Sequence, residues 1–392
     1  MIPYRRISRR TTKQGKRSHA CLRAVARILG GILTAWTLVA GVEAWTPSAQ
    51  AASLNWAYLW ANQPTAASYT PNLFYQLNSS GATNTVVRTG VGAYIASLPN
   101  LGAWIPAAGI VHVTAYGVGT EACKVAGWGP NGSTEQVYVQ CFTRTGVPVD
   151  TYFTLTYARP LSVAGPMAFL WANQPATASY TPNLFYQFNS SGATNTVART
   201  GVGAYIASLP NLGAATGHVQ VTAYGPGSER CKVASWYPSG STQQVNVRCF
   251  TSTGAPVDTL FTMTYVDDLN LIGGASLFGA GGTGAPGPTG AYVWANQPTT
   301  ASYTPALSYQ WNDFGGTNTI TRSGVGAYSV QFAGQALSEG DVQVTAYGYG
   351  SEYCKVAYWT QGAGVQVRCF SSAGVPVDTY FTVTFLSWFQ GF

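Results

Sequence analysis

The strongest constraint on the fold of this chain is an internal repeat. The segment WANQP begins at Trp60, Trp171 and Trp294, and each copy continues into a second shared motif of the form CKVA…VxVxCF. Each copy spans roughly 100 residues, an ordinary size for a domain with its own core, whereas the repeats of a solenoid are shorter and depend on their neighbours. We therefore expect three modules that fold independently. The expected modules span residues 57–158, 168–265 and 291–386.

The segments between the copies have the composition of linkers. Residues 266–290 are rich in Gly and Pro, and this composition gives a flexible or extended chain. A shorter joint, residues 158–167, separates the first two copies. The sequence thus predicts separate modules connected by linkers, with the longest linker before the third copy.

Within a copy the residues alternate as they do in β-strands. In Thr259–Tyr265 the side chains of Phe261, Met263 and Tyr265 fall on one face and two threonines fall on the other. A period of two with Thr and aromatic residues is typical of a half-buried strand. No convincing helical periodicity follows residue 51. These patterns predict an all-β chain of antiparallel β-sandwich or small-barrel modules with about seven strands each, of which the segment PNLFYQF is one.

Residues 1–51 differ from the rest of the chain and have the order of a secretory signal peptide. A basic region precedes an apolar run that ends at SAQAAS, where Ala49 and Ala51 give the small-residue pattern of a cleavage site. The apolar run also approaches membrane-spanning length, so a retained signal anchor is the alternative. A weak twin-arginine match leaves the export route, Sec or Tat, open. We expect cleavage and a secreted, extracellular protein, either free or at the cell surface.

The positive charge of the chain is concentrated in this leader. Nine of the 20 Lys and Arg residues lie in it, which leaves 11 of them against 12 Asp and Glu in the mature chain. A nearly neutral chain lacks the basic face that nucleic-acid binding needs. No later apolar stretch is long enough to span a bilayer as a helix. We therefore expect neither a nucleic-acid partner nor a membrane span after the signal.

The motif that begins CKVA predicts a disulfide-bonded hairpin in each copy. In CKVASWYPSGSTQQVNVRCF, turn residues separate two alternating runs, so folding about Gly240 sets the two cysteines opposite each other. The third copy is shorter only at the turn, which a hairpin tolerates. Zinc is excluded because the mature chain holds only His112 and His218 and no CxxC motif, and the even number of mature cysteines fits oxidation after export. The expected pairs are Cys123–Cys141, Cys231–Cys249 and Cys354–Cys369.

Strict alternation places one Trp of each hairpin on the face opposite the inward-pointing cysteines, beside basic and polar residues. If that face is exposed, each module presents a Trp that could stack on a sugar ring and cations that could bind its hydroxyls. The alternative is that the Trp packs against a neighbouring strand or loop, and that recurring acids neutralise the Lys and Arg residues. These acids are Asp258, Asp378, Glu229 and Glu352. The candidate ligand surface consists of Trp128, Trp236, Trp359, Lys124, Lys232, Lys355, Arg248 and Arg368.

No constellation of catalytic residues recurs in the copies. Each copy has one Arg before GVGAY and one Asp in PVDT, and a structural ion pair or a turn cap explains them most simply. An interpretation as a glycoside hydrolase would pair Asp258 with Glu229. His112 aligns with Gln220 and Gln343, so no Ser-His-Asp set recurs, and each lone His is expected to be a surface or strand residue. The sequence assigns no catalytic residue, no cofactor and no metal.

The copies share the motif VQVTAYG…CKV…W…VxVxCF…GxPVDTxFT. In this motif the chain resembles exported tandem β-repeat proteins of bacteria, which form no named family. The resemblance implies a secreted β-module and carries no activity. We expect extracellular binding or adhesion to a glycan or cell-wall polymer, by avidity across the copies. The alternatives are a structural envelope or matrix protein without a small ligand and, third, a glycoside hydrolase.

Overall fold

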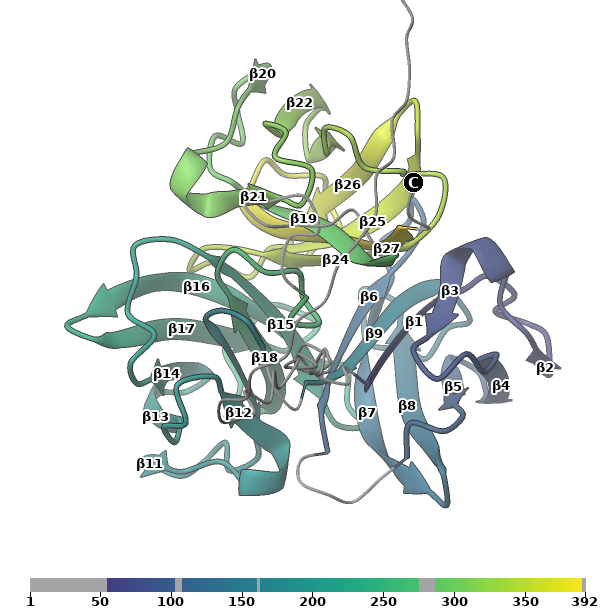
Figure 1. The fold of residues 1–392 in the computed structure, drawn as a ribbon, viewed down its shortest axis with the longest axis horizontal. Helices are drawn as coiled ribbons and strands as arrows, with labels where there is room; N and C mark the ends of the chain where they lie inside the picture. The colour runs from purple at the N-terminus through teal and green to yellow at the C-terminus, as the bar shows by residue number, and fades with distance from the viewer. Residues whose placement is uncertain (1–54, 103–107, 161–162, 275–285, 390–392) are drawn as a thin grey trace, which may run out of the picture. The chain divides into compact units, whose positions relative to one another are not determined.

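Strands follow the alternating segments of the sequence (Figure 1), and single-turn 3-10 helices are the one kind of helix among the residues described. The computed structural model describes residues 55–102, 108–160, 163–274 and 286–389. The predicted signal peptide, residues 1–51, and part of the predicted linker, residues 275–285, lie outside this range. The predicted all-β class is confirmed.

The first copy contains strands β1 to β9 and one short helix, η1. They are β1 (Asn55–Ala61), β2 (Ser68–Tyr69), η1 (Leu73–Tyr75), β3 (Gln76–Asn78), β4 (Thr85–Gly90), β5 (Ala93–Leu98), β6 (Ile110–Ala115), β7 (Ala122–Asn131), β8 (Thr134–Phe142) and β9 (Phe153–Arg159). The prediction of a single strand over PNLFYQF, residues 182–188 of the second copy, is therefore wrong, because a single-turn helix occupies both that segment and its first-copy counterpart, residues 71–77. Asn72 accepts a hydrogen bond of 3.0 Å from the backbone N–H of Phe74, and this local bond favours a turn over an extended chain.

The second and third copies repeat this order of elements. The second copy contains β10 (Met167–Ala172), β11 (Ser179–Tyr180), η2 (Leu184–Tyr186), β12 (Gln187–Asn189), β13 (Thr196–Gly201), β14 (Ala204–Leu209), β15 (His218–Tyr224), β16 (Arg230–Ser239), β17 (Thr242–Phe250) and β18 (Leu260–Val266). The third contains β19 (Gly287–Ala295), β20 (Ser302–Tyr303), η3 (Leu307–Tyr309), β21 (Gln310–Asn312), β22 (Thr319–Gly324), β23 (Ala327–Gln331), β24 (Asp341–Ala346), β25 (Tyr353–Thr360), β26 (Gly364–Phe370) and β27 (Phe381–Phe389).

Each copy folds into two antiparallel sheets that share one core. In the first copy one sheet has the order β3-β1-β9-β6 and the other the order β2-β4-β5-β8-β7. The later copies repeat both orders, as β12-β10-β18-β15 with β11-β13-β14-β17-β16, and as β21-β19-β27-β24 with β20-β22-β23-β26-β25. Alternate apolar side chains of both sheets pack together between them, for example Leu59 and Phe153 from the first sheet against Tyr94 and Val139 from the second. This is the predicted β-sandwich architecture.

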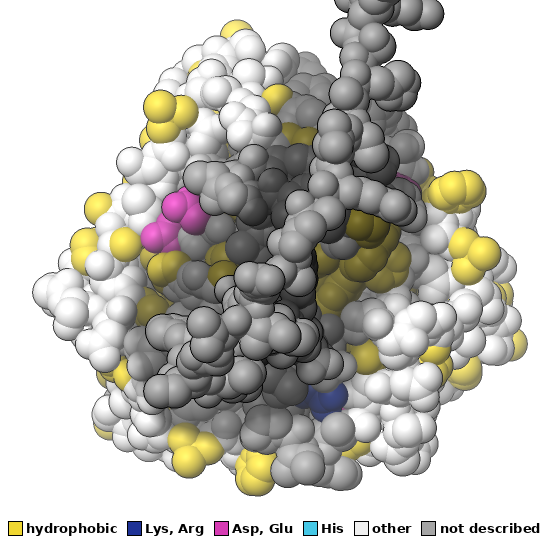
Figure 2. All heavy atoms as spheres, in the orientation of Figure 1, with side chains coloured by type: hydrophobic (Ala, Val, Ile, Leu, Met, Phe, Trp, Pro, Cys, Tyr) yellow, Lys and Arg dark blue, Asp and Glu magenta, His cyan; other side chains and the backbone are white. Residues whose placement is uncertain are grey.

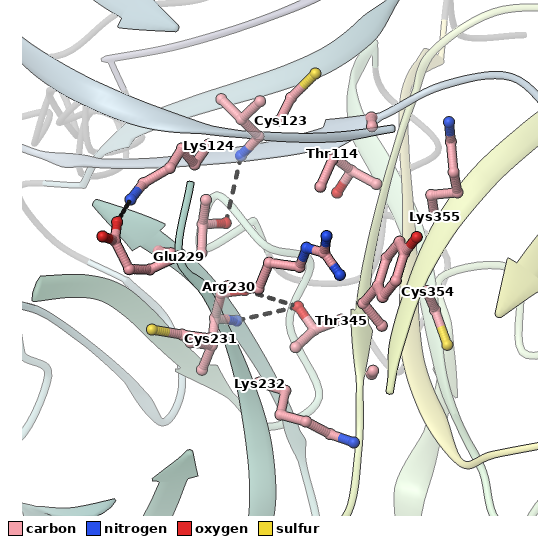
Figure 3. Close-up of a pocket in the computed structure, with 18 of the residues that line it drawn as sticks. Thr114, Cys123, Lys124, Glu229, Arg230, Cys231, Lys232, Thr345, Cys354 and Lys355 are labelled. Carbon is pink, nitrogen blue, oxygen red and sulfur yellow. Dashed lines mark hydrogen bonds and ion pairs between the residues drawn. The ribbon is translucent and has the colours of Figure 1, made fainter. Parts of the chain in front are cut away.

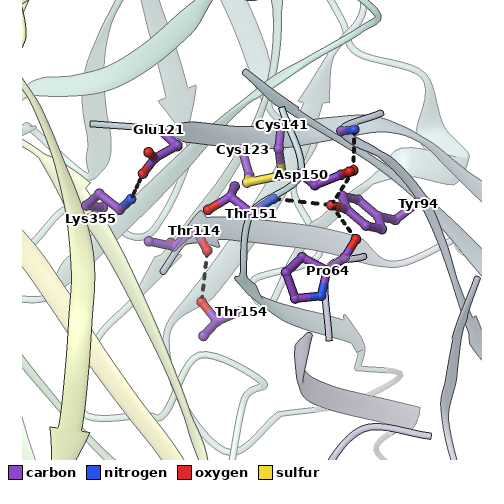
Figure 4. The surroundings of a disulfide bond; sticks show 11 residues. Pro64, Tyr94, Thr114, Glu121, Cys123, Cys141, Asp150, Thr151, Thr154 and Lys355 are labelled. Carbon is purple, nitrogen blue, oxygen red and sulfur yellow. Dashed lines mark hydrogen bonds and ion pairs between the residues drawn. A yellow bond between two sulfur atoms is a disulfide. The ribbon is translucent and has the colours of Figure 1, made fainter. Parts of the chain in front are cut away.

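The hairpins that carry the cysteines form as predicted. Strands β7 and β8 pair so that Cys123 lies opposite Cys141, and a disulfide joins the two (Figure 4). The equivalent bridges are Cys231–Cys249 and Cys354–Cys369. In each bridge the second cysteine is fully buried in the core. Closing loops of this length should stabilise each copy by roughly 3 kcal/mol.

The three copies contact one another, and the contacts run in a closed cycle. Strand β7 of the first copy pairs in parallel with β15 of the second. Equivalent parallel bridges join the second copy to the third and the third back to the first. The bridges are Val125–Tyr224, Val233–Tyr347 and Val356–Tyr116. The described residues therefore belong to one compact unit, whereas the sequence predicted separate modules.

Threonine hydroxyls join the copies at their centre. The last strand of each copy carries a buried threonine whose hydroxyl donates to a backbone carbonyl of another copy. The bonds are Thr154 to Val342 at 2.7 Å, Thr262 to Val111 at 2.8 Å and Thr382 to Val219 at 2.8 Å. These carbonyls lie on β24, β6 and β15. Strands β24 and β6 end four-stranded sheets, and β15 is the last second-copy strand of its sheet, which continues into β7 of the first copy. The hydroxyls thus satisfy carbonyls that would otherwise be buried without a partner.

A second set of polar side chains closes the same centre. The contacts between copies are Thr114–Gln343, Thr222–His112 and Thr345–Gln220. His112 also lies 2.8 Å from the Thr264 hydroxyl. Burial lowers the pKa of His112 and His218 to about 3, so both rings are neutral at ordinary pH. Both are strand residues, one of the two settings that the sequence suggested, and both are buried.

The described ends of the predicted linker are packed against the three copies. Leu269 and Ile272 are 2% and 0% exposed, in an apolar cluster with Tyr58, Met167 and Tyr292. Strand β19 also begins within the predicted linker, at its Gly/Pro-rich end. The prediction of a flexible linker is therefore wrong for these described residues. Its apolar side chains find a buried surface that exists only when the copies are assembled.

His112→Gln should reduce the loss of stability in acid. The pKa of His112 is about 3 in the folded protein, because burial disfavours the cation, and about 6.5 in the unfolded chain. Above pH 6.5 the ring is neutral in both states and this residue costs no stability. As the pH falls from 6.5 toward 3, the unfolded state binds a proton that the folded state does not, so the free energy of unfolding decreases.

In the unaltered protein, His112 should make the free energy of unfolding about 2–3 kcal/mol smaller at pH 4.5 than at pH 7.5. The substitution restores the glutamine found in the other two copies and should remove that loss. Urea unfolding of both proteins across this pH range measures the difference. Parallel pH profiles would contradict a buried, neutral His112.

Candidate functional site

The three tryptophans of the predicted ligand surface are buried. Trp128, Trp236 and Trp359 are 7%, 6% and 4% exposed. Each indole N–H donates to a backbone carbonyl of its own copy, and the acceptor for Trp128 is Ala108 at 3.1 Å. A ring in this position cannot stack on a sugar. The prediction of a Trp-based ligand face is therefore wrong, and the alternative, packing against neighbouring strands, is observed.

A β-bulge in the hairpin explains why strict alternation failed. Strands β7 and β8 pair regularly up to Val125, but the register shifts by one residue before Gly127. An extra residue in one strand turns the side chains that follow it to the opposite face. Trp128 therefore lies opposite Val137 and joins the core. The same shift recurs in the second and third hairpins.

The buried tryptophans form an aromatic cluster at each junction between copies. Trp128 of the first copy packs edge-on against Trp171, Tyr186 and Tyr224 of the second, with ring centroids 6.0, 5.3 and 5.6 Å apart. Edge-to-face pairs at this spacing are favourable beyond the area they bury. Equivalent clusters form at the other two junctions. The two tryptophans that recur in every copy are thus partners across the junctions.

The lysines of the predicted surface are also buried, and each pairs with a glutamate of another copy. The side chain of Lys124 is 3% exposed, and its ammonium lies 2.8 Å from the Glu229 carboxylate (Figure 3). The equivalent pairs are Lys232–Glu352 at 3.0 Å and Lys355–Glu121 at 2.9 Å (Figure 4). The third pair returns to the first copy, so the ion pairs follow the same closed cycle as the strand contacts.

The electrostatics of these pairs make them structural. Burial lowers the pKa of Lys124, and the bond to Glu229 offsets part of that effect. Burial also raises the pKa of Glu229, but the hydrogen bond and charge of Lys124 outweigh it and the net pKa lies below the ordinary value. Glu229 is therefore ionised at neutral pH. The alternative interpretation is therefore correct for Glu229 and Glu352, which pair with lysines of the predicted surface. It is wrong for Asp258 and Asp378, which bind Arg199 and Arg322 instead.

The two arginines of the predicted surface lie apart from the tryptophans. Arg248 lies opposite Lys232 in its hairpin, and its guanidinium is 5.5 Å from the ring centre of Tyr349 in the third copy. Tyr349 is 63% exposed, so this is a weak surface contact. Arg368 lies opposite Lys355 and is partly exposed. The eight predicted residues therefore do not form one exposed face.

The recurring Arg and Asp form a structural ion pair, as the sequence suggests. Arg88 binds Asp150 through two hydrogen bonds of 2.9 and 2.8 Å. The same carboxylate accepts from Gly92 N–H and the Tyr94 hydroxyl (Figure 4), and these bonds, with that of Arg88 foremost, hold the pKa of Asp150 below its ordinary value. The other pairs are Arg199–Asp258 and Arg322–Asp378.

A glycine is required beside this ion pair. Gly92 has φ +66°, and a Cβ there would lie 2.5 Å from the carbonyl oxygen of Cys141. The backbone must come this close for the Gly92 N–H to reach Asp150 at 2.8 Å. The GVG that follows each Arg therefore serves this contact.

The carboxylates of the hydrolase interpretation are both held by cations. Asp258 binds Arg199, and Glu229 binds Lys124. The pKa of Asp258 is lowered, first of all by the hydrogen bond from Arg199, and the pKa of Glu229 is lowered as well. A glycosidase needs one carboxyl group whose pKa is raised so that it can act as an acid. This pair does not supply one.

An open cleft lies at the edge of the second copy, on the loop that contains η2. Its volume is about 500 Å³. It is lined by Asn173, Gln174, Thr181, Pro182, Asn183, Leu184 and Phe185. Asn183 accepts a hydrogen bond from Phe185 N–H at 3.0 Å, which fixes the turn. Tyr186 joins the junction cluster, while Leu184 and Phe185 remain 66% and 53% exposed.

The same exposed loop recurs in the other copies with one difference. Leu73 and Phe74 are each 70% exposed, and Leu307 is 73% exposed. The third copy has Ser308 where the first two have Phe. The space-filling view shows hydrophobic side chains in small groups on the visible described surface, with few charged ones (Figure 2). Sequence analysis missed these loops because it assigned PNLFYQF to a strand.

Each WANQP segment holds two buried polar atoms without a hydrogen-bond partner among the described residues. In the second copy they are Trp171 Nε1, a donor, and Asn173 Oδ1, an acceptor. The WANQP segments of the other copies repeat the pair. Buried polar groups normally have a partner, and a water or a hydroxyl group could serve both atoms.

No protein-family model, curated protein or solved structure matches this chain. Across the described ranges, no helix is both long and apolar enough to cross a bilayer. The same ranges contain no group of three or more His, Cys, Asp or Glu side chains placed to hold a metal ion.

Glu229→Ala should lower the free energy of unfolding by about 2–4 kcal/mol, because it leaves the buried Lys124 ammonium without a counter-charge. The double variant Lys124→Met/Glu229→Ala should recover most of this loss, since an apolar side chain of similar length needs no partner. Urea unfolding at pH 7.5 measures both. Equal destabilisation of the single and double variants would contradict the explanation.

Proposed function

We propose that this protein is a non-catalytic extracellular binding protein that attaches to a glycan or cell-wall polymer. The observation that carries the proposal is the cleft beside Leu184 and Phe185, where exposed apolar side chains adjoin amide and hydroxyl groups. Sites for small ligands combine apolar surface with a few polar groups that fix orientation. The cleft takes the place of the tryptophan surface that the sequence suggested, because those tryptophans are buried.

The lining of the cleft matches the chemistry of a sugar. The ring of Phe185 can pack against the C–H face of a pyranose, while Asn173 and Gln174 can hydrogen-bond its hydroxyls. A hydroxyl is both donor and acceptor, so it can pair with either end of an amide side chain such as that of Gln174. An uncharged lining favours a neutral glycan over a polyanion.

Repetition of the loop supports binding by avidity. The copies belong to one compact unit, so their loops keep a fixed spacing. Linked weak sites can raise the apparent affinity by roughly 10²–10⁴ without a new contact, provided that one target spans them. A polymer with a repeating unit meets that condition.

The disulfides suit this setting. Bridges of this kind persist in oxidising surroundings outside the cytosol. Export, and a location in the extracellular medium or at the cell surface, are part of the proposal.

The double variant Phe74→Ser/Phe185→Ser should weaken polymer binding by about tenfold or more, because it removes the apolar platform from two copies. The third copy already carries Ser308 at this position, so serine is compatible with the loop. A screen of glycans and cell-wall polymers, followed by titration of the best binder, measures the change. Folding should be unaffected, because both phenylalanines are more than half exposed.

Val91→Ser is the matched control, since Val91 is 57% exposed and lies in the GVG turn instead of the cleft. Its binding should equal that of the unaltered protein. If no polymer binds, or if the double variant binds as well as the control, the proposal is contradicted and a structural envelope or matrix role is favoured.

A further inference from the structure

The copies enclose a small cavity at their common centre. Its volume is about 70 Å³, and residues from all three copies line it (Figure 3). The lining is largely threefold in character, with an equivalent Thr, Glu, Cys and Lys from each copy. The largest break in the pattern is at one position. The residue before the first cysteine is Ala122 in the first copy, Arg230 in the second and Tyr353 in the third.

Arg230 extends into the middle of this group, whereas the labelled lysines point outward (Figure 3). Its guanidinium carbon lies 3.9 Å from the ring centre of Tyr353. One terminal nitrogen donates to the backbone carbonyl of Arg144 at 2.9 Å. The Nε atom is buried and has no hydrogen-bond partner among the described residues. Most of the donor capacity of the guanidinium is therefore unused.

The charge around the cavity is unbalanced. Each lining lysine has a glutamate partner at 2.8–3.0 Å. Arg230 has no ion pair with a carboxylate in the described ranges, and burial lowers its pKa. Arg230 is only partly buried, so the cost arises at its buried Nε–H, which has no acceptor among the described residues. The glutamates are directed to their lysines and so leave this cation uncompensated.

We propose that the central cavity binds one small oxyanion, such as phosphate, sulfate or a carboxylate, through Arg230. The planar guanidinium offers donors in a fork that matches two oxygens of such an anion, and the ring of Tyr353 holds it in place. Ser228 and Ser351 also line the cavity and can donate hydroxyl bonds. The cavity volume exceeds the roughly 10–15 Å³ that suffices for one water, so a small anion fits. The site is separate from the proposed polymer clefts and does not depend on them.

Thermal unfolding of the full disulfide-bonded chain tests the proposal. Phosphate should raise the unfolding temperature in a saturable way at constant ionic strength, with NaCl as the balancing salt. Calorimetric titration should show one phosphate per chain. Sulfate and acetate in the same assay distinguish a tetrahedral from a planar anion. Polyphosphate distinguishes a free anion from an anionic group of a polymer, and it should bind less well than phosphate.

Arg230→Ala should weaken phosphate binding by about tenfold or more, because it removes charged hydrogen bonds. Alanine is the residue of the first copy at this position, so the backbone accepts it. Arg368→Ala removes one positive charge outside the cavity lining and should bind phosphate normally. Arg230→Lys keeps the charge without the forked donors. It should bind phosphate more tightly than Arg230→Ala and less tightly than the unaltered protein.

An unfolding temperature that follows ionic strength alone would overturn the proposal, and this result needs no variant. Equal phosphate binding by Arg230→Ala and the unaltered protein would also overturn it. A preference for polyphosphate would contradict the assignment to a small anion.

Discussion

Satisfying buried carbonyls at the centre is the constraint on which the assembled structure depends. Strands β6, β15 and β24 are each the last strand that their own copy contributes to a sheet. Their carbonyls accept hydrogen bonds of 2.7–2.8 Å from threonine hydroxyls of another copy. A sandwich that stood alone would have to expose these groups to water. The lysine ammonium groups and the aromatic rings at the junctions likewise find their partners only in another copy. The contacts close into a cycle, so no copy is left with an unmatched face of this kind.

Local features of the structure could be predicted from the sequence, and features that need a second copy could not. The disulfide of Cys123 and Cys141 and the ion pair of Arg88 and Asp150 lie within one copy and follow from hairpin geometry and recurrence. The predicted face of Trp128 was wrong because of the bulge before Gly127. No Gly or Pro that the copies share marks this bulge in the sequence. The burial of Lys124 is caused by another copy, which alternation within one hairpin cannot reveal.

The differences between copies fall into two groups with different consequences. At the periphery the loops stay similar, so that the proposed polymer sites are repeated with a modest change at Ser308. At the centre, equivalent residues diverge, as in Ala122, Arg230 and Tyr353. Because this position differs in every copy, a single Arg and a single Tyr face one cavity that all three copies line. Repetition therefore suits avidity at the rim, and divergence suits a single small-ligand site at the centre.

Scanning calorimetry of the intact, disulfide-bonded chain tests the central claim most directly. If buried contacts between the copies hold them as one unit, the protein should unfold in a single transition whose calorimetric and van't Hoff enthalpies agree. Three separable transitions would show that each module folds independently and would contradict the account. A single transition whose van't Hoff enthalpy is only about one third of its calorimetric enthalpy would contradict it as well.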